Sequence, residues 1–229
     1  QTAMKKGYQL ELLKKLGLTS ARSNFNMDFF RGRVMFAIHN LSGKVIAFGA
    51  RTLKSDKKIP KYINSPETEI YVKSNVLYGI YHAKKAIRQE DRCYLVEGYT
   101  DVISLHQAGI ENVVASSGTS LTTDQVRLVK RYTSNITILY DGDAAGIKAA
   151  MRGIELILEA GMNVKVVLLP EGEDPDSKVQ KMGAADFKAF IAEKEEDFIF
   201  FKTNLLLEEA GGDPVKKAGL IKDIVSTIA

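Results

Sequence analysis

The sequence has few of the residues that stabilise small disulfide-rich or zinc-clamped proteins. Its 229 residues include one cysteine, Cys93, no tryptophan and three histidines. A single thiol cannot form a disulfide within the chain, and it excludes a cysteine-based zinc ribbon. We therefore expect no zinc in this chain, and the scarcity of cysteine fits a reducing cytoplasm. Cys93 lies in the apolar run 93–96, which predicts a buried, unreactive thiol.

Long apolar runs are also missing. No stretch approaches the roughly 20 apolar residues that a membrane-spanning helix needs. The longest run, around Val166 to Leu169, has the length of a strand. There is no basic start followed by an apolar stretch, so no signal peptide is expected. The N-terminus reads as mid-protein sequence. These features predict a cytoplasmic, globular fragment without membrane contact, and we expect a monomer.

Charge is unevenly distributed, although the net charge is only +4. Residues 1–90 carry 17 basic and 6 acidic residues, a surplus of 11 positive charges, whereas the rest carries 15 and 22, a deficit of 7. The first part favours a polyanionic partner, and the second concentrates carboxylates. An enzyme that holds both phosphates and metal ions would show this division. Two solvated faces of opposite sign would show it as well.

The first and last parts of the chain have different patterns. The first part is basic and favours β-structure, with strands expected over 34–38 and 44–48 around a turn at Ser42-Gly43. The last part, 183–229, has no strand pattern. Helices are expected there over 187–207 and 215–228, which reads as a helical region cut short.

The central part alternates helices and strands. Strands are expected over 93–97, 113–115, 136–140 and 164–169, and helices over 76–88, 100–107, 122–130 and 144–160. Thr100 and Thr122 are the expected N-caps of the second and third of these helices. This order with short connections predicts an α/β fold with a mostly parallel sheet covered by helices.

Acidic residues recur where the predicted central strands end. They follow the first, third and fourth strands, and they are Glu97, Asp101, Asp141, Asp143, Asp174 and Asp176. In a parallel sheet these ends share one edge, where ligands bind. Six like charges repel unless cations offset them, and hard oxygen ligands suit Mg²⁺, for which Mn²⁺ can substitute. The sequence therefore predicts a divalent-metal site, with helix capping by Asp141 and Asp174 as the alternative.

Other ligand patterns do not fit. Asp141-Gly142-Asp143 resembles the start of an EF-hand loop, but Ala145 and Arg152 stand where that loop needs its fifth and twelfth ligands. The phosphate-binding Walker A motif and the GxGxxG motif are both missing. The three histidines have no metal-ligand spacing, and we interpret them as structural or surface residues: His39, His82 and His106.

Four segments of the central part resemble the Toprim motifs of DnaG-type bacterial primases: 97–102 (EGYTDV), 115–120 (ASSGTS), 140–146 (YDGDAAG) and 169–176 (LPEGEDPD). Toprim domains also occur in topoisomerases, OLD-type nucleases and RecR-like proteins. The upstream segments 31–38, 60–68 (PKYINSPET) and 77–79 narrow the resemblance to primases. It covers roughly residues 4–200, and it departs from the family at Phe29, often Arg, and at Ala37, usually Pro.

The resemblance implies a domain division and a role for individual residues. It implies a basic N-terminal subdomain of the primase core over 1–74, a Toprim catalytic domain over 75–182 and a truncated helical subdomain over 183–229. All six acidic residues above match metal-binding positions or lie beside them, with Glu97, Asp141 and Asp143 as the catalytic set. The remaining matches are Arg51, Lys61, Asn64 and Lys73 for nucleotide binding, and Arg31, Arg33 and Tyr62 for DNA binding, although Tyr62 could equally pack in the core.

The activity implied by the resemblance is DNA-templated synthesis of short RNA primers from NTPs in the bacterial replisome. The implied partners are single-stranded DNA, NTPs and the RNA–DNA hybrid product. Full primases also contact the replicative helicase and carry a zinc-binding domain, both through regions absent from this chain. The rival hypotheses are a Toprim nuclease or topoisomerase-like enzyme, which would use the same carboxylates, and a RecR-like DNA-binding scaffold without catalysis.

Overall fold

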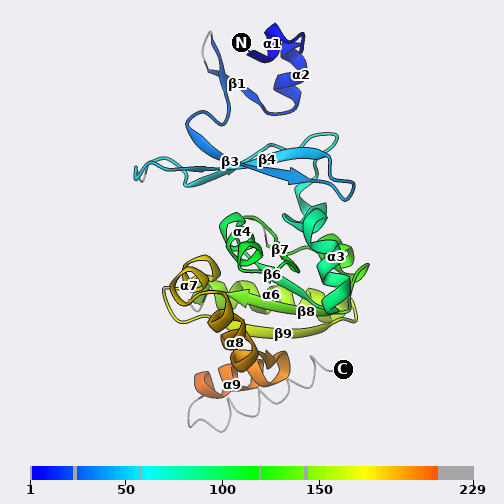
Figure 1. Cartoon of the computed structure of the whole chain (residues 1–229), viewed down its shortest axis with the longest axis vertical. Helices are drawn as coiled ribbons and strands as arrows, with labels where there is room; N and C mark the ends of the chain where they lie inside the picture. The colour runs from blue at the N-terminus through cyan, green and yellow to red at the C-terminus, as the bar shows by residue number, and fades with distance from the viewer. Residues whose placement is uncertain (1, 23–24, 57, 119, 142–143, 211–229) are drawn as a thin grey trace.

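The computed structural model describes residues 2–22, 25–56, 58–118, 120–141 and 144–210. Figure 1 shows an elongated molecule with the N-terminal elements at one end, the central sheet below them and α9 at the other end. The predicted α/β class is confirmed: antiparallel N-terminal sheets precede a mostly parallel five-stranded sheet and C-terminal helices. None of the helices in these ranges combines the length and the apolar character needed to cross a bilayer.

The N-terminal region contains two separate antiparallel sheets. Short helices α1 (Thr2–Lys5) and α2 (Leu10–Lys15) precede a hairpin of β1 (Thr19–Arg22) and β2 (Phe25–Asp28). The second sheet has the order β3 (Arg33–His39), β4 (Val45–Thr52) and β5 (Tyr62–Asn64). The expected hairpin around Ser42-Gly43 is confirmed: the Asn40 Oδ1 accepts hydrogen bonds from the backbone N–H groups of Ser42 and Lys44, at 3.1 and 3.0 Å.

The central sheet has the strand order β10-β9-β8-β6-β7. Four strands are parallel, and they are β6 (Cys93–Val96), β7 (Val113–Ala115), β8 (Asn135–Tyr140) and β9 (Asn163–Leu168). The edge strand β10 (Glu196–Asp197) pairs antiparallel with β9. The sequence patterns predict no strand at β10, because two residues are too few to show an alternation.

The helices of the central and C-terminal parts follow the predicted order with corrections at several ends, except that the sequence patterns give no helix over 175–182. They are α3 (Ile80–Glu90), α4 (Tyr99–Gln107), α5 (Thr123–Lys130), α6 (Ala144–Glu159), α7 (Pro175–Met182), α8 (Ala184–Lys194) and α9 (Phe198–Ala210), with a 3₁₀ turn η1 (Lys73–Asn75). Thr122 caps α5 as expected. The α3 helix begins at Ile80 rather than 76, because Tyr78 forms a β-bridge with Ala115 and Gly79 has φ 87°.

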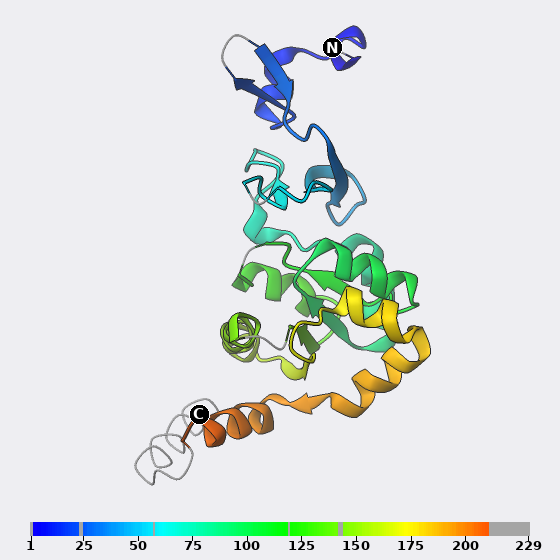
Figure 2. The same ribbon diagram turned by 90° about the vertical axis from the view of Figure 1, so that its left-hand side faces the viewer.

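Two further helix predictions need correction or lie outside the described chain. Gly98 rather than Thr100 is the N-cap of α4, and the Asp101 carboxylate accepts a hydrogen bond from its N–H. The expected helix over 187–207 is divided into α8 and α9 by β10. Figure 2 shows this chain path from α8 through β10 to α9. The expected helix over 215–228 lies outside the described residues.

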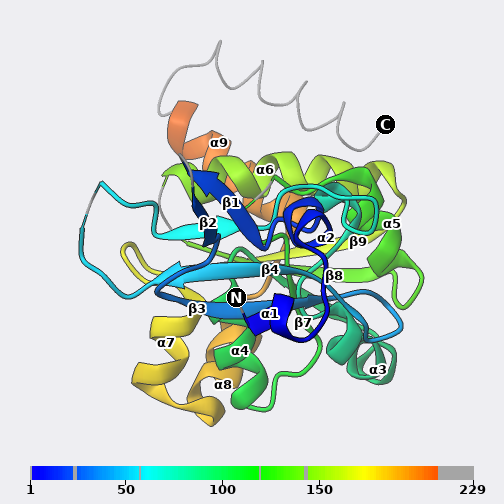
Figure 3. The same ribbon diagram turned by 90° about the horizontal axis from the view of Figure 1, so that it is seen from above.

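The sheet is buried on both faces by helices. Alternate strand residues such as Leu95, Ile138 and Val166 pack with α3, α5, α6 and α9 in one apolar cluster. Their neighbours Val96, Leu139 and Val167 pack with α4, α7 and α8 in the other. Figure 3, seen from above, shows α5 and α6 on one side of the sheet and α4, α7 and α8 on the other. Strands buried on both faces account for the nearly continuous apolar runs in the sequence.

A third apolar cluster joins the N-terminal β3–β5 sheet to the central sheet. The Tyr99 ring, on the first turn of α4, stacks on Phe36 of β3 with the centroids 4.9 Å apart and the planes 6° apart. It lies directly over Gly49 of β4, where an added Cβ would stand 2.4 Å from the ring Cζ. Any side chain at position 49 would therefore separate the two sheets.

We predict that Gly49→Ala lowers the free energy of unfolding by about 1–3 kcal/mol, because the methyl group would overpack the contact with Tyr99. Gly153→Ala is the matched control, since its Cβ would stand 3.5 Å from Leu121 in ordinary contact. On α6 this control should be neutral or stabilising by about 0.5–1 kcal/mol. Urea unfolding of both variants measures the difference, and equal stabilities would contradict the close contact.

Candidate active site

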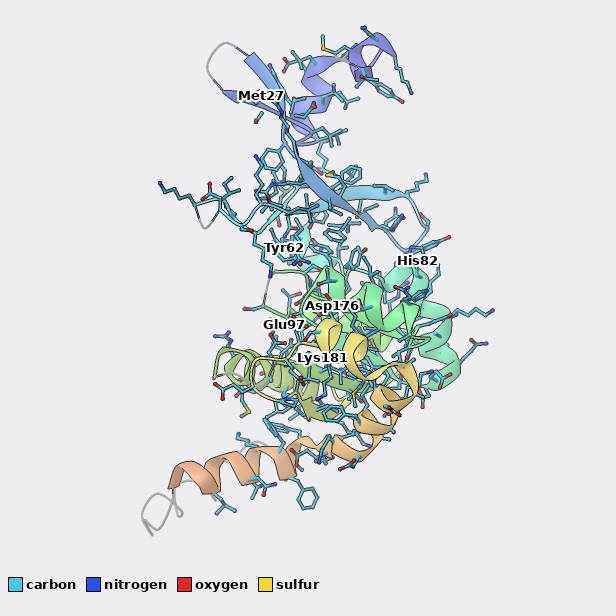
Figure 4. The ribbon with its side chains drawn as sticks, turned by 60° about the vertical axis from the view of Figure 1, so that its left-hand side comes forward. Met27, Tyr62, His82, Glu97, Asp176 and Lys181 are labelled. Atoms are coloured by element: carbon cyan, nitrogen blue, oxygen red, sulfur yellow. The ribbon has the colours of Figure 1, made fainter. Side chains whose placement is uncertain are left out.

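The carboxyl ends of β6, β8 and β9 lie at one edge of the central sheet, as the parallel pairing requires. Glu97 follows β6 directly and is exposed, and Asp141 follows β8 and is half-buried. Asp174 and Asp176 lie at the start of α7, which follows β9. Asp143 lies outside the described residues. Figure 4 shows Glu97 and Asp176 on the same side of the molecule, below Tyr62.

Asp101 is the buried member of this acidic group, with 6% of its surface exposed. Its Oδ2 accepts a hydrogen bond from the Gly98 N–H at 2.9 Å, and its Oδ1 accepts one from the Asp176 N–H at 3.2 Å. Burial raises the pKa of Asp101 to about 6, and the charges of Asp174 and Asp141 contribute, whereas the two amide hydrogen bonds oppose the rise. Asp101 thus ties α4 to α7 among other negative charges.

Asp174 and Asp176 both have local partners. Asp174 is the N-cap of α7, where its Oδ1 accepts a hydrogen bond from the Ser177 N–H at 2.7 Å. The Asp176 Oδ1 accepts one from the Ser104 hydroxyl of α4 at 2.5 Å and another from the Gln180 amide. The helix-capping alternative is therefore correct for Asp174, but capping uses only one of its two carboxylate oxygens.

The acidic edge offers oxygen donors only, the donor type that Mg²⁺ and Mn²⁺ prefer. Within the described ranges, no three carboxylate, imidazole or thiol groups meet the geometry of a complete metal site. Burial is the main cause of the raised pKa of Asp101, and the charges of Asp174 and Asp141 add to it. Carboxylates gathered at one sheet edge fit a divalent cation, while the identity of its ligands stays a prediction.

The basic residues of the N-terminal sheet surround Tyr62 at the start of β5. The Arg51 Cζ lies 5.7 Å and the Lys61 Nζ 5.9 Å from the centre of the Tyr62 ring. The ring also approaches those of Phe36 and Tyr99, at 6.5 and 6.2 Å. Tyr62 is half-buried, so it packs in the third cluster and still borders solvent. Arg51 and Lys61 line a neighbouring cavity of about 570 Å³ under the loop 53–60.

Asn64 and Lys73 both contact the loop after β7. The Asn64 Nδ2 donates to the Ser117 carbonyl at 3.2 Å, and the Lys73 ammonium donates to the Gly118 carbonyl at 3.4 Å. The Tyr99 hydroxyl donates to the Asn64 Oδ1 at 2.7 Å. Ser117 has φ 55°, a strained value for a residue other than glycine. Asn64 and Lys73, two of the four residues expected to bind a nucleotide, therefore donate hydrogen bonds to the loop after β7, in which Ser117 is strained.

A pocket of about 450 Å³ lies between these two sets of residues. Tyr62 and Asn64 line it from the N-terminal sheet, Glu97 from the acidic edge and Arg152 from α6. Of the residues predicted for the site, the structure thus brings Tyr62, Asn64 and Glu97 into one pocket. The residues Arg51 and Lys61 stand beside it in the adjoining cavity.

The two arginines predicted to bind DNA differ in their surroundings. Arg33, on β3, donates from its guanidinium to the carbonyls of Pro60 and Lys61, at 2.9 and 3.3 Å. It therefore holds the segment that carries Lys61. Arg31 lies in the turn before β3 and is exposed. Neither lines the pocket of about 450 Å³.

The sequence patterns miss several residues that line or shape the pocket. Tyr99 and Tyr140 line it, and so does Arg152, which lies well inside α6. No local spacing marks Arg152, because its place in the pocket depends on the packing of α6 against the sheet. Tyr99 does stand inside the segment EGYTDV, but its hydroxyl partner Asn64 is 35 residues away.

Both the N-terminal and the central part of the chain match models of known protein families. Residues 1–84 match the model of the DNA primase catalytic core, N-terminal domain, and residues 94–179 match a Toprim-like model. A solved DNA primase domain from Pseudomonas aeruginosa is 40% identical with a TM-score of 0.85, covering 96% of this chain and 71% of that one. The chain belongs to the DnaG-type DNA primase catalytic domains.

Two further primases are similar over nearly the whole chain. A DnaG primase catalytic domain bound to single-stranded DNA has a TM-score of 0.86 and 37% identity, covering 99% of this chain and 76% of that one. The DNA primase of Staphylococcus aureus (strain COL) is 38% identical over 227 residues, which are 98% of this chain. The chain spans about 38% of that primase's length.

We predict that Tyr99→Phe destabilises this primase domain by about 1–2 kcal/mol, because the Asn64 Oδ1 would lose its buried donor while the aromatic stacking stays. The control is Tyr8→Phe, since Tyr8 is 56% exposed. Denaturant unfolding measures both. A Tyr99→Phe variant as stable as Tyr8→Phe would show that the hydroxyl contributes nothing to the junction.

Proposed function

We infer that this domain synthesises short RNA primers on single-stranded DNA from NTPs. The observation that carries this proposal is the pocket of about 450 Å³ in which Tyr62 and Asn64 face Glu97 of the acidic edge. A nucleotide seated there would place its phosphates between basic residues and carboxylates. Membership of the DnaG-type primases supports the same activity.

The division of roles follows the charge of the two halves. Over the proposed N-terminal subdomain 1–74, the cations Arg51, Lys61 and Lys73 hold the triphosphate, because cations neutralise phosphates and donate to them. Asn64, the fourth residue predicted to bind the nucleotide, connects β5 to the loop after β7 and to α4 through the Ser117 carbonyl and the Tyr99 hydroxyl. The proposed Toprim domain 75–182 supplies the carboxylates, and the helical subdomain 183–229 supports the sheet edge through β10.

We propose that the carboxylates of the acidic edge hold Mg²⁺ or Mn²⁺. They are Glu97, Asp141, Asp143, Asp174 and Asp176, with Asp101 beside them. When bound, the ion would neutralise charge at the reacting phosphates and orient the attacking 3′-hydroxyl. Asp101 orients this edge, because its two oxygens fix the Gly98 and Asp176 amides. The Ser104 hydroxyl holds the Asp176 carboxylate from α4. The chain's own residues thus pre-form the edge before substrate arrives.

The template would follow the basic N-terminal surface. Arg31 is exposed for a phosphate contact, Arg33 fixes the Lys61 segment and Tyr62 offers a ring edge for stacking. Binding through phosphates predicts weak, salt-sensitive affinity. The RNA–DNA hybrid would leave by the same surface. We expect contacts with the replicative helicase and with a zinc-binding domain in the longer primases. The proposed place of action is the cytoplasmic replisome.

We expect Asp141→Ala to abolish primer synthesis and to leave the affinity for single-stranded DNA nearly unchanged, because it removes a carboxylate of the acidic edge and no cation. Gel assay of labelled NTP incorporation and fluorescence anisotropy of labelled DNA measure the two effects. Asp124→Ala is the control, since Asp124 is exposed on α5 and pairs only with Arg127 in the described chain. Normal primer yield from a folded Asp141→Ala variant would remove Asp141 from the catalytic set.

Lys61→Ala should raise the NTP concentration at half-maximal rate by about tenfold, the effect of losing about 1.4 kcal/mol of a charge-assisted contact. Lys58→Ala, in the same loop and exposed, controls for a general loss of positive charge. Initial rates over a range of NTP concentrations give the comparison. An NTP dependence equal to that of Lys58→Ala would exclude Lys61 from the triphosphate site.

A further inference from the structure

The three histidines of the chain, far apart in the sequence, line one cavity. His39 ends β3, His82 lies on α3 and His106 lies on α4. The cavity has a volume of about 360 Å³ and lies between the N-terminal sheet and the central domain. Figure 4 shows His82 well apart from Glu97 and Asp176, so this cavity is separate from the candidate active site.

The aromatic rings around His82 are close together. The ring centroids of His39 and His82 are 5.2 Å apart with the planes at 87°, and those of Tyr81 and His82 are 5.0 Å apart. The Lys84 ammonium lies 4.5 Å from the Tyr81 ring centre and donates to the Leu41 carbonyl. Positive or protonatable groups therefore gather here. The described residues that line the cavity include no carboxylate.

Apart from Tyr78 and the polar Gln107, the remaining residues that line the cavity are apolar. Ala37 contributes from β3, Val102 and Ile103 from α4, and Val113 from β7. A metal ion does not suit this lining, since within the described chain no three imidazole, thiol or carboxylate groups meet the geometry of a metal site. An apolar wall with hydrogen-bonding imidazoles at one side suits a ligand that is itself amphipathic.

We propose that this cavity binds a small anion with a planar apolar body, such as an aromatic sulfonate, carboxylate or phosphate. The imidazole N–H groups of His39, His82 and His106 donate to the anionic group. The planar body lies on Val102 and Ile103. His82 and His106 are exposed and His39 is half-buried, so a ligand reaches all three from solvent.

The surroundings of His82 disfavour its protonated form in the absence of a bound anion. Burial, followed by the charges of His39 and His106, lowers the pKa of His82 below its usual value. The other titratable groups around these rings are Tyr78, whose pKa is raised by burial, Tyr81, whose ring lies 6.0 Å from His39 and 5.0 Å from His82, and the Lys84 ammonium over the Tyr81 ring. A bound anion favours the protonated form of His82, so binding takes up a proton and tightens as the pH falls.

The cavity also shares a wall with the aromatic junction. Tyr78 lines it, and the Tyr78 ring lies edge-on to Tyr99 with the centroids 4.7 Å apart. The Tyr99 hydroxyl in turn donates to Asn64 in the other pocket. A ligand that shifts Tyr78 therefore acts directly on the contact that joins the two sheets.

The test uses imidazole NMR of the ¹⁵N-labelled full chain, because all three histidine signals report this one cavity. The probe is 1-naphthalenesulfonate, which is an anion at every pH used, and the neutral comparison is 1-naphthalenesulfonamide. We expect saturable shifts of all three imidazoles with one-to-one stoichiometry. The dissociation constant should be about tenfold lower at pH 6 than at pH 8, and the sulfonamide should bind about tenfold more weakly at pH 6.

Ile103→Trp tests the location, since the larger side chain fills the cavity and should abolish the shifts. Ile199→Trp, on α9, is the matched control, because Ile103 is 43% exposed and Ile199 42%. Backbone amide spectra check that both variants are folded. The proposal is overturned if the imidazoles do not shift at millimolar probe, if the neutral analogue binds equally well, or if Ile103→Trp binds like Ile199→Trp. No nucleotide, DNA or metal enters the assay, so its result is independent of the proposed function.

Discussion

The seat of the Tyr99 ring on the N-terminal sheet is the contact on which the rest of the site depends. The ring stacks on Phe36, fills the space that Gly49 leaves open and donates its hydroxyl to Asn64. Because Tyr99 is also the first residue of α4, which carries Asp101, it connects the basic sheet to the acidic edge. Tyr99 lines the pocket, whose walls come from both sheets.

The parts of the chain on the two sides of this contact carry charge of opposite sign. The basic half concentrates cations around Tyr62, and the acidic half concentrates carboxylates at the ends of three parallel strands. Each half alone would repel further charge of its own sign. Together they suit a substrate that carries phosphates and a cation at once. Asp101 is buried at this edge, and burial, with a smaller contribution from the charges of Asp174 and Asp141, raises its pKa to about 6.

The sequence predicts the central sheet and the position of its acidic edge well, because periodicity and strand ends are local properties. Thr122 as the cap of α5 and the turn at Ser42-Gly43 are confirmed for the same reason. The two-residue strand β10 and the start of α3 are missed, because pairing with distant strands decides them. Asn64 is expected to contact a triphosphate, yet its amide already bonds Tyr99 and Ser117, contacts that no spacing reveals. The convergence of three histidines from three elements is invisible in the sequence for the same reason.

Primer synthesis by the unmodified chain is the most direct test of the account. The chain at high concentration would be incubated with single-stranded DNA, Mg²⁺ or Mn²⁺ and labelled NTPs, and each component would be omitted in turn. The account predicts short RNA products that require template, NTPs and metal together. Metal-dependent loss of the DNA without NTPs, and without any RNA product, would contradict it and identify the acidic edge as a nuclease site.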